Sequence, residues 1–273
     1  MIKNKEKGQA LLVVVLVMIV ALTVGLSLTS RSIVSLRTSS EEADSQKALA
    51  AAEAGIEQAL KINIDQTLTG SFNENATTYS TIIKEAKGTD PILVNGGSLV
   101  LQDDGADIWL VSHTVTADDA IPNYSLENWT GDLTMYWGDV SLDDCSNSAL
   151  EVAVISNAAP YSLKRYVYDP CELRRSGNNF ALPTTAVTSI GTMQFKYQIT
   201  NVISSGLVVR VVPIYTNSAI AVKGSVALPS QGFYNESTGL SGLGDRQVAR
   251  SISRFRTYKQ LATQYFLYGL FSP

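Results

Sequence analysis

Hydrophobic residues dominate one long segment near the start of the chain, residues 9–30, which contains no charged side chain. At about 1.5 Å per helical residue, a segment of this length can cross a hydrocarbon core of roughly 30 Å. The pattern therefore predicts a membrane-spanning helix. No small-residue A-x-A site follows the apolar run near Leu28, so we do not expect a cleavable secretory signal.

Helical character continues beyond the apolar segment. The following thirty or so residues contain no proline and are rich in Ala, Glu and Gln, which are strong helix formers. Apolar residues such as Leu49, Ala52 and Ile56 recur at spacings of three and four, so one face can pack on a folded domain. We expect one long helix over residues 9–62, amphipathic beyond its membrane-spanning part.

The remainder of the chain, residues 63–273, has the alternating pattern of half-buried β-strands. Residues 63–97 are predicted to link the helix to the sheet, and the Gly-rich run Gly239–Gly244 is predicted to be a hairpin turn. Pro213 lies inside one strand candidate and favours an edge position or a bulge there. The strand candidates are residues 108–111, 133–137, 150–155, 166–168, 193–199, 207–215 and 219–222.

These patterns predict the α+β class, with a long N-terminal helix packed on a β-rich globular domain. Lys3, Lys5 and Lys7 precede the apolar segment and outnumber Glu6, which favours a cytoplasmic N-terminus. Everything after the span is then extracytoplasmic. We expect the chain in the cytoplasmic membrane as a single-pass protein.

The residues around the start of the apolar segment resemble a known family. Lys7 and Gly8, followed by the apolar run from Gln9 and an Ala-rich segment at residues 50–57, resemble the N-terminus of a type IV prepilin. Within that superfamily the sequence of these segments is most similar to PilX-type minor pilins. The resemblance implies that residues 1–8 are a leader, removed by a prepilin peptidase, and that the new N-terminus at Gln9 can be methylated.

Two positions depart from the common pilin pattern. Gln9 stands where most pilins have an aromatic residue or Met, and Val13 stands where most have Glu. In the family, that carboxylate is thought to pair with the terminal amine of a neighbouring subunit inside an apolar fibre core. A buried amine without its partner is costly, so this chain is poorly suited to sit above another copy of itself. The resemblance therefore implies a minor or tip subunit of the pilus and not the main repeating one.

The resemblance also implies partners and a location. Other major and minor pilins, an assembly platform protein and an assembly ATPase are the implied protein partners, and membrane lipid surrounds the helix before assembly. After assembly the subunit belongs to an extracellular pilus, where it supports pilus assembly and adhesion. The alternative is a single-pass anchored extracellular binding module or hydrolase unrelated to pili.

Composition adds an uneven distribution of charge. The formal net charge is −4, yet residues 89–163 carry twelve acids and no Lys or Arg, whereas residues 164–259 carry twelve basic residues and four acids. Two solvated surfaces, or acidic and basic segments that neighbour one another in the fold, explain this simply. The alternatives are a calcium site in the acidic half, or opposite faces that meet in adjacent subunits.

Cys145 and Cys171 lie in the part placed outside the cytoplasm, where a disulfide can form. Two unpaired thiols are the alternative. His113 is the only histidine, so a zinc site is not expected.

Three nearby acids form a candidate calcium site, Asp103, Asp104 and Asp107, although their spacing does not match an EF-hand loop. We expect no other cofactor.

Four arginines share a parity near the C-terminus and would lie on one face of a strand: Arg246, Arg250, Arg254 and Arg256. Such a stripe could contact phosphates, or could simply protect a solvated edge strand. The chain is acidic and shows no aromatic platform beside the stripe, so we do not expect nucleic-acid binding.

Catalytic motifs are not apparent in the sequence: there is no G-x-S-x-G, H-E-x-x-H or Walker pattern. We expect a structural protein and not an enzyme. Several aromatic residues near the C-terminus are predicted to cover a core, with an exposed docking patch as the alternative: Tyr258, Tyr265, Phe266, Tyr268 and Phe271.

Overall fold

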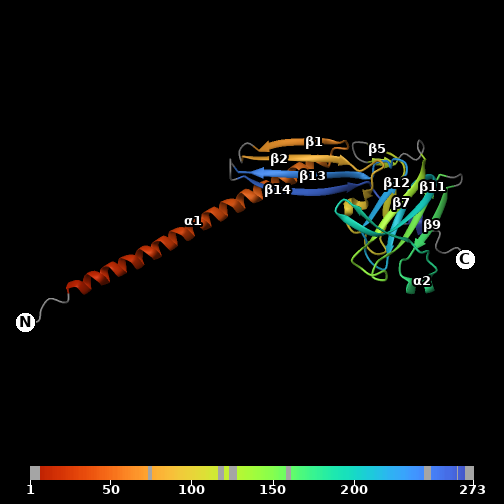
Figure 1. Ribbon diagram of the computed structural model, residues 1–273. Coiled ribbons are helices and arrows are strands. Elements are labelled where there is room, and N and C mark those ends of the chain that lie inside the picture. The colour runs from red at the N-terminus through yellow and green to blue at the C-terminus, as the bar shows by residue number, and fades with distance from the viewer. Residues whose placement is uncertain are drawn as a thin grey trace, which may run out of the picture. The chain divides into compact units, whose positions relative to one another are not determined.

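The computed structural model describes residues 7–72, 76–115, 120–122, 128–157, 161–242, 247–262 and 264–267. Its longest element is α1 (Lys7–Ala59), a single helix of 53 residues that is drawn in red and orange in Figure 1. The chain divides into two compact units. The first comprises Met1–Gly55, Thr69–Ser80 and Thr238–Ile252, and the second comprises Ile56–Leu68, Thr81–Ser237 and Ser253–Pro273.

Four strands form a sheet in which they are hydrogen-bonded in the order β1-β2-β13-β14 (Figure 1). Alternate residues of β2 are buried and exposed along almost its whole length, so one face of this sheet is covered by protein. The four strands are β1 (Gln66–Phe72), β2 (Thr77–Glu85), β13 (Gly232–Ser241) and β14 (Val248–Thr257).

Within the first unit, small residues bring α1 and β13 into backbone contact. Ala48, Ala51 and Ala52 are buried on the helix side. On the strand side, a Cβ atom added to Gly239 would lie 1.9 Å from the Ala48 carbonyl oxygen and 2.7 Å from the Ala52 nitrogen. Only a residue without a side chain fits this approach, which explains a glycine in the middle of a strand.

The second unit contains a sheet of eight strands, with the order β3-β12-β7-β11-β8-β9 and with β10 and β4 also paired to β11. The long β11 pairs with β7 and then β4 along one edge, and with β10 and then β8 along the other. The eight strands are β3 (Ile92–Leu93), β4 (Ala106–Trp109), β7 (Trp129–Asp139), β8 (Ala149–Ser156), β9 (Ser162–Tyr168), β10 (Thr184–Ile190), β11 (Met193–Ile214) and β12 (Ile220–Gly224).

Shorter elements complete the described residues. A two-stranded ribbon, β5 and β6, follows β4, and a short helix α2 follows β9. The bounds of these elements are η2 (Val94–Gly97), β5 (His113–Val115), β6 (Ala120–Pro122), α2 (Glu172–Asn178) and α3 (Gln264–Leu267).

The largest hydrophobic cluster of the second unit packs against the eight-stranded sheet, and smaller clusters surround Trp109 and Phe195. Leu133, Met135 and Trp137 alternate along β7 and are fully buried, as the period of a strand requires. Trp137 keeps its indole nitrogen satisfied by donating to the Ser148 carbonyl at 3.0 Å. Burial of such large side chains is the main stabilising contribution in this unit.

The predicted α+β class is confirmed. Every strand candidate overlaps an observed strand, and residues 193–199 and 207–215 are the two ends of the single strand β11. Pro213 pairs with Leu150 of β8 but lies past the pairing of β11 with β4, which covers only residues 208–211. Its missing N–H is therefore tolerated at the position where one edge of β11 has lost its β4 partner.

One expectation on the chain path is wrong, and a second holds only in part, because β13 and β14 are neighbours in one sheet but the turn between them begins later than expected. Residues 63–97 are not merely a link, because they contain β1, β2 and β3. In the Gly-rich run, residues 239–241 belong to β13, and the first residue with a turn-like backbone is Gly242, whose φ is +101°. The pattern misleads because the covered face of β13 carries small and polar residues, which single-sequence reasoning takes for a loop.

Candidate functional site: the N-terminal helix

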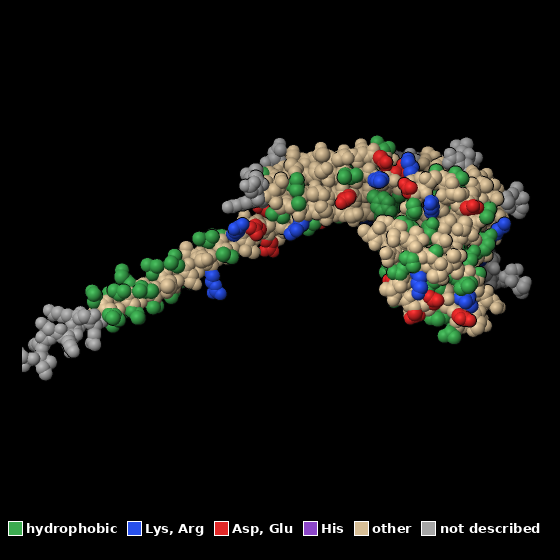
Figure 2. Space-filling model, viewed as in Figure 1, with side chains coloured by type: hydrophobic (Ala, Val, Ile, Leu, Met, Phe, Trp, Pro, Cys, Tyr) green, Lys and Arg blue, Asp and Glu red, His purple; other side chains and the backbone are tan. Residues whose placement is uncertain are grey.

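The first half of α1 is apolar and uncovered. Its large side chains are exposed, with Leu12 at 67% and Leu16 at 57%, and the most apolar stretch is not buried at all within the structure. Figure 2 shows hydrophobic side chains gathered along this part of the helix. By length and composition it can cross a membrane. So large a continuous apolar surface needs lipid or protein around it.

The predicted processing residues lie at the start of this helix. The backbone of Lys7, Gly8 and Gln9 belongs to α1, which begins at Lys7. Val13, the position where pilins usually carry Glu, is exposed on the apolar half of the helix. Cleavage after Gly8 and the role of Val13 stay predictions.

Hydroxyl side chains within the apolar half donate to the helix backbone. The Thr29 hydroxyl donates to the Gly25 carbonyl at 2.9 Å, and the Thr23 hydroxyl donates to the Val20 carbonyl at 2.8 Å. Such bonds satisfy the hydroxyl groups without help from water, which suits an apolar environment. They also compete with the helical hydrogen bonds of the same carbonyls, which makes a helix easier to bend at such positions.

The end of α1 is held by an arginine in the second unit. Arg256 donates to the carbonyl oxygens of Leu60 and Ile62, the latter at 2.7 Å, and to Oδ1 of Asn63 at 2.6 Å. Its guanidinium carbon lies 4.9 Å from the centre of the Phe233 ring. Burial lowers the pKa of Arg256, but an arginine stays charged. The group therefore caps the helix at its negative end.

The predicted basic stripe is thus only partly a free surface. Arg250 donates from Nε to the Ser45 hydroxyl of α1 at 2.8 Å, within the first unit, and Arg256 caps α1 in the second. Arg254 is exposed. Arg246 lies outside the described residues. Phosphate contact by the four arginines stays an untested prediction.

The predicted disulfide is present. Cys145 and Cys171 are joined, with Cα atoms 4.5 Å apart and 26 positions apart in sequence. Beside it, Arg174 forms an ion pair with Asp169 at 2.8 Å and donates to the carbonyl oxygens of Cys145, at 2.7 Å, and Asn147, at 2.9 Å. The disulfide and Arg174 therefore fix the same loop, residues 139–147.

Asp169 is fully buried under this arrangement. Burial alone would raise its pKa, but hydrogen bonds from Arg174, from the Cys171 N–H and from Asn178 outweigh it, and the pKa of Asp169 lies below its usual range. The carboxylate remains charged and paired.

The three acids of the candidate calcium site have different surroundings. The Asp107 side chain is fully buried and accepts two hydrogen bonds from Arg210, at 2.7 and 2.9 Å, and one from the Leu261 N–H at 2.6 Å. Asp104 accepts from the Gly105 N–H, and Asp103 has a φ of +60°. Among the described residues no group of three or more His, Cys, Asp or Glu side chains is placed to hold a metal. Calcium binding stays a prediction.

The C-terminal aromatic residues divide between core and surface. Phe266 is buried and lies under the Arg210 guanidinium at 4.1 Å, whereas Tyr265 is 60% exposed. Tyr258 stacks on His113 with ring centres 3.8 Å apart and planes 5° apart. Tyr268 and Phe271 lie outside the described residues.

Sequence reasoning missed the roles of Arg256, Arg174 and Arg210. Each is a buried or half-buried arginine that ties together segments distant in sequence, so no local pattern marks it. Arg210 gives the only signal, because it is a lone charge inside the apolar run of β11. A charge in such a position needs a buried partner, which here is Asp107.

Comparison with protein families gives one match, which covers the first part of the chain. The model of the PilX N-terminal family matches residues 7–57, which is nearly the whole of α1. Comparisons with curated proteins and with solved structures gave no match. That family is a structural component of type IV pili and not an enzyme family. Over residues 7–57 the chain therefore matches the PilX N-terminal family, and its resemblance to minor pilins of type IV pili is confirmed.

Proposed function

We propose that this protein is a minor subunit of a type IV pilus, held in the cytoplasmic membrane by α1 and later incorporated into the filament through the same helix. The observation that carries the proposal is the coincidence of the PilX N-terminal match with an uncovered apolar helix. Neither a soluble enzyme nor a secreted binding protein needs such a helix.

The helix serves both states because its environment changes little. In the membrane its apolar side chains contact lipid, and in a filament they contact helices of other pilins. Lipid and helix surfaces are similarly apolar, so hydrophobic transfer alone does not drive extraction. An assembly ATPase and a platform protein would supply the work.

The described domain would act as the part displayed on the filament. The Arg256 cap and the contact of Gly239 with Ala48 each couple the sheet to the lower half of α1 within its own unit. The helix and the displayed strands would then move into the filament together. Adhesion and support of assembly are roles that such a displayed domain can take.

Processing provides the first test. Intact mass spectrometry of membranes should show a chain that begins at Gln9 when the prepilin peptidase is present, and an uncut chain when it is absent. Gly8→Leu should remain uncut in both strains. A chain that keeps residues 1–8 in the presence of an active peptidase would favour the anchored binding module or hydrolase.

A tip position is supported by Val13. It stands where the carboxylate of other pilins is thought to pair with the terminal amine of a neighbouring subunit. Immunogold labelling of filaments should mark their ends and not their length. Val13→Glu should increase labelling along the filament, since the added carboxylate could pair with a neighbouring terminal amine. Uniform labelling of the wild-type filament would contradict the tip position.

A further inference from the structure

The second unit contains a cavity of about 570 Å³ beside the disulfide-fixed loop. Its lining comes from four separate parts of the chain: Leu99, the segment from the end of β7 to Asn147, the turn between β10 and β11, and residues 216–219. The volume lies in the range of pockets that hold small molecules. The function of the N-terminal helix makes no use of it.

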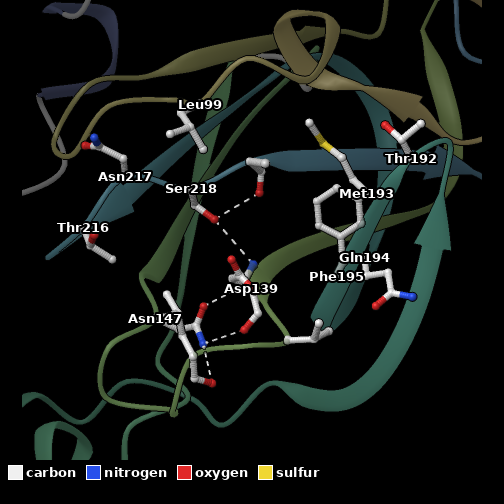
Figure 3. A pocket seen from close by; sticks show the side chains of 14 residues that line it. Leu99, Asp139, Asn147, Thr192, Met193, Gln194, Phe195, Thr216, Asn217 and Ser218 are labelled. Atoms are coloured by element: carbon white, nitrogen blue, oxygen red, sulfur yellow. Dashed lines mark hydrogen bonds between the residues drawn. The ribbon is translucent and has the colours of Figure 1, made fainter.

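The lining combines an apolar wall with polar groups. In Figure 3, Met193 and Phe195 lie across the cavity from Ser218 and Asp139, with Leu99 at its edge. Exposed apolar side chains, with Leu99 at 58%, stand at the rim. A patch of exposed apolar side chains around polar groups is a common feature of binding sites.

One negative charge and no positive charge lie in the lining. Among the described residues that line the cavity there is no Lys, Arg or His, and Asp139 is the acid. Its Oδ1 accepts from the Ser141 hydroxyl at 2.7 Å and from the Ser141 N–H at 2.8 Å. These hydrogen bonds lower the pKa of Asp139, so its carboxylate is charged at neutral pH. An anionic ligand would be repelled.

The loop that forms one wall, residues 139–147, is unusually well fixed from within. The buried Asn147 accepts from the Asp139 N–H at 2.7 Å, and its amide nitrogen donates to the carbonyl oxygens of Asp139, at 3.1 Å, and Asp143, at 3.0 Å. Figure 3 shows Asn147 turned toward the Asp139 backbone. One side chain therefore sets the curvature of the loop.

Neighbouring elements hold the same loop from outside. Lys196 donates to the Leu142 carbonyl at 2.7 Å, and the Tyr197 hydroxyl donates to Asp144 at 2.5 Å. Arg174 and the disulfide hold Cys145. A wall fixed in this way loses little conformational entropy when a ligand binds, which favours binding.

We propose that this cavity binds a neutral saccharide. A sugar ring has an apolar C–H face, which suits the wall of Met193, Phe195 and Leu99, and a rim of hydroxyl groups. The carboxylate of Asp139 and the polar groups of Thr216 and Asn217 can accept or donate hydrogen bonds to such hydroxyls. The absence of a cation in the described lining, together with Asp139, selects against sialylated or phosphorylated sugars.

The test uses the full chain in lipid nanodiscs, because detergents with sugar head groups would compete. An array of neutral and acidic glycans should show binding to neutral ones, and saturation-transfer NMR with lactose and sialyllactose should show a preference for lactose. Thr192→Trp places a bulky side chain at an exposed edge of the cavity and should weaken binding at least about tenfold. Val202→Trp, on an exposed part of β11 outside the lining, is the matched control and should bind normally.

A second blocking variant keeps the test valid if Thr192→Trp does not fold. Leu99→Trp alters an exposed rim residue, and its melting temperature should match that of the wild type. Asp139→Asn should allow sialyllactose to bind about tenfold better than it does to the wild type. Failure of every neutral glycan to bind, equal binding by both tryptophan variants and the control, or a preference for sialyllactose would overturn the proposal. None of these results depends on incorporation into a pilus.

Discussion

Arg256 donates a hydrogen bond of 2.7 Å to the carbonyl oxygen of Ile62, three residues beyond the end of α1. This carbonyl group belongs to the turn that follows α1, and a positive charge at the C-terminal end of a helix interacts favourably with the helix dipole. The same side chain donates to Leu60 and Asn63 and covers the face of Phe233. One arginine therefore joins the end of the helix to β14 and β13 inside the second unit.

Replacement of Arg256 by Met should lower stability by about 1 to 3 kcal/mol, because carbonyl groups at the helix end lose a charged donor. Thermal unfolding of the full chain in detergent, followed by circular dichroism, measures the change. Arg254→Met is the control, since Arg254 is exposed on the same strand, and its effect should stay within about 0.5 kcal/mol. Equal losses of stability in the two variants would show that the hydrogen bonds of Arg256 do not stabilise the fold.

Gly239→Ala should separate α1 from β13 in the first unit. The added Cβ would lie 1.9 Å from the Ala48 carbonyl oxygen, and both partners are backbone, so neither can turn away. Overpacking of this kind typically costs about 1 to 3 kcal/mol. Gly177→Ala is the control, because nothing lies within 4 Å of the Cβ that it adds in α2, and it should be neutral or slightly stabilising. Amide hydrogen exchange at residues 48–52 would reveal the local loss.

Removal of the disulfide, as Cys145→Ser with Cys171→Ser, should reduce stability by about 3 to 4 kcal/mol in the chain-entropy account. The bond closes a loop over a separation of 26 positions. A reducing agent should lower the melting temperature of the wild-type chain to that of the double variant and leave the double variant unchanged. A wild-type melting temperature that ignores the reducing agent would contradict a stabilising role.

His113 should make the second unit sensitive to mild acid. Burial lowers the pKa of His113 to about 4, whereas the unfolded residue titrates at about 6.5. The unfolded chain then binds the extra proton more readily, so stability falls as the pH drops from about 6.5 to about 4. His113 faces the rings of Trp109 and Tyr258, and the buried carboxylates with lowered pKa, such as Asp169, titrate below this window.

The variant His113→Phe keeps the stack on Tyr258 and removes the titration. Its melting temperature should change less between pH 7 and pH 4.5 than that of the wild type. Melting curves at a series of pH values give the comparison. An unchanged slope would mean that His113 does not carry the acid sensitivity.

Prediction from sequence succeeds where a pattern is local. The apolar run before Arg31 and the spacing of Ala52 and Ile56 predict α1, although Leu49 is 41% exposed and Ala48 is buried in its place. The alternation of residues 133–137 predicts the strand β7. It fails for β1, β2 and β13, because most of their covered positions are small or polar and only a few join a hydrophobic cluster. The usual period of large apolar residues is therefore hidden.

The candidate site shows the same division. The processing residues follow from a contiguous motif, and the disulfide follows from two cysteines in an oxidising compartment. The Arg256 cap and the Asp107 to Arg210 pair join residues more than a hundred positions apart. The sequence around each of these residues gives no indication of its distant partner. The cavity beside Asn147 likewise exists only once four segments have met.

The central claim is that a processed form of this chain becomes part of a pilus. Intact mass spectrometry of sheared filaments tests it most directly, with a strain that lacks the assembly ATPase as the control. The account predicts a chain that begins at Gln9, present in small amount in filaments of the parent strain and confined to membranes in the control. An unprocessed chain found only in membranes of both strains would contradict it.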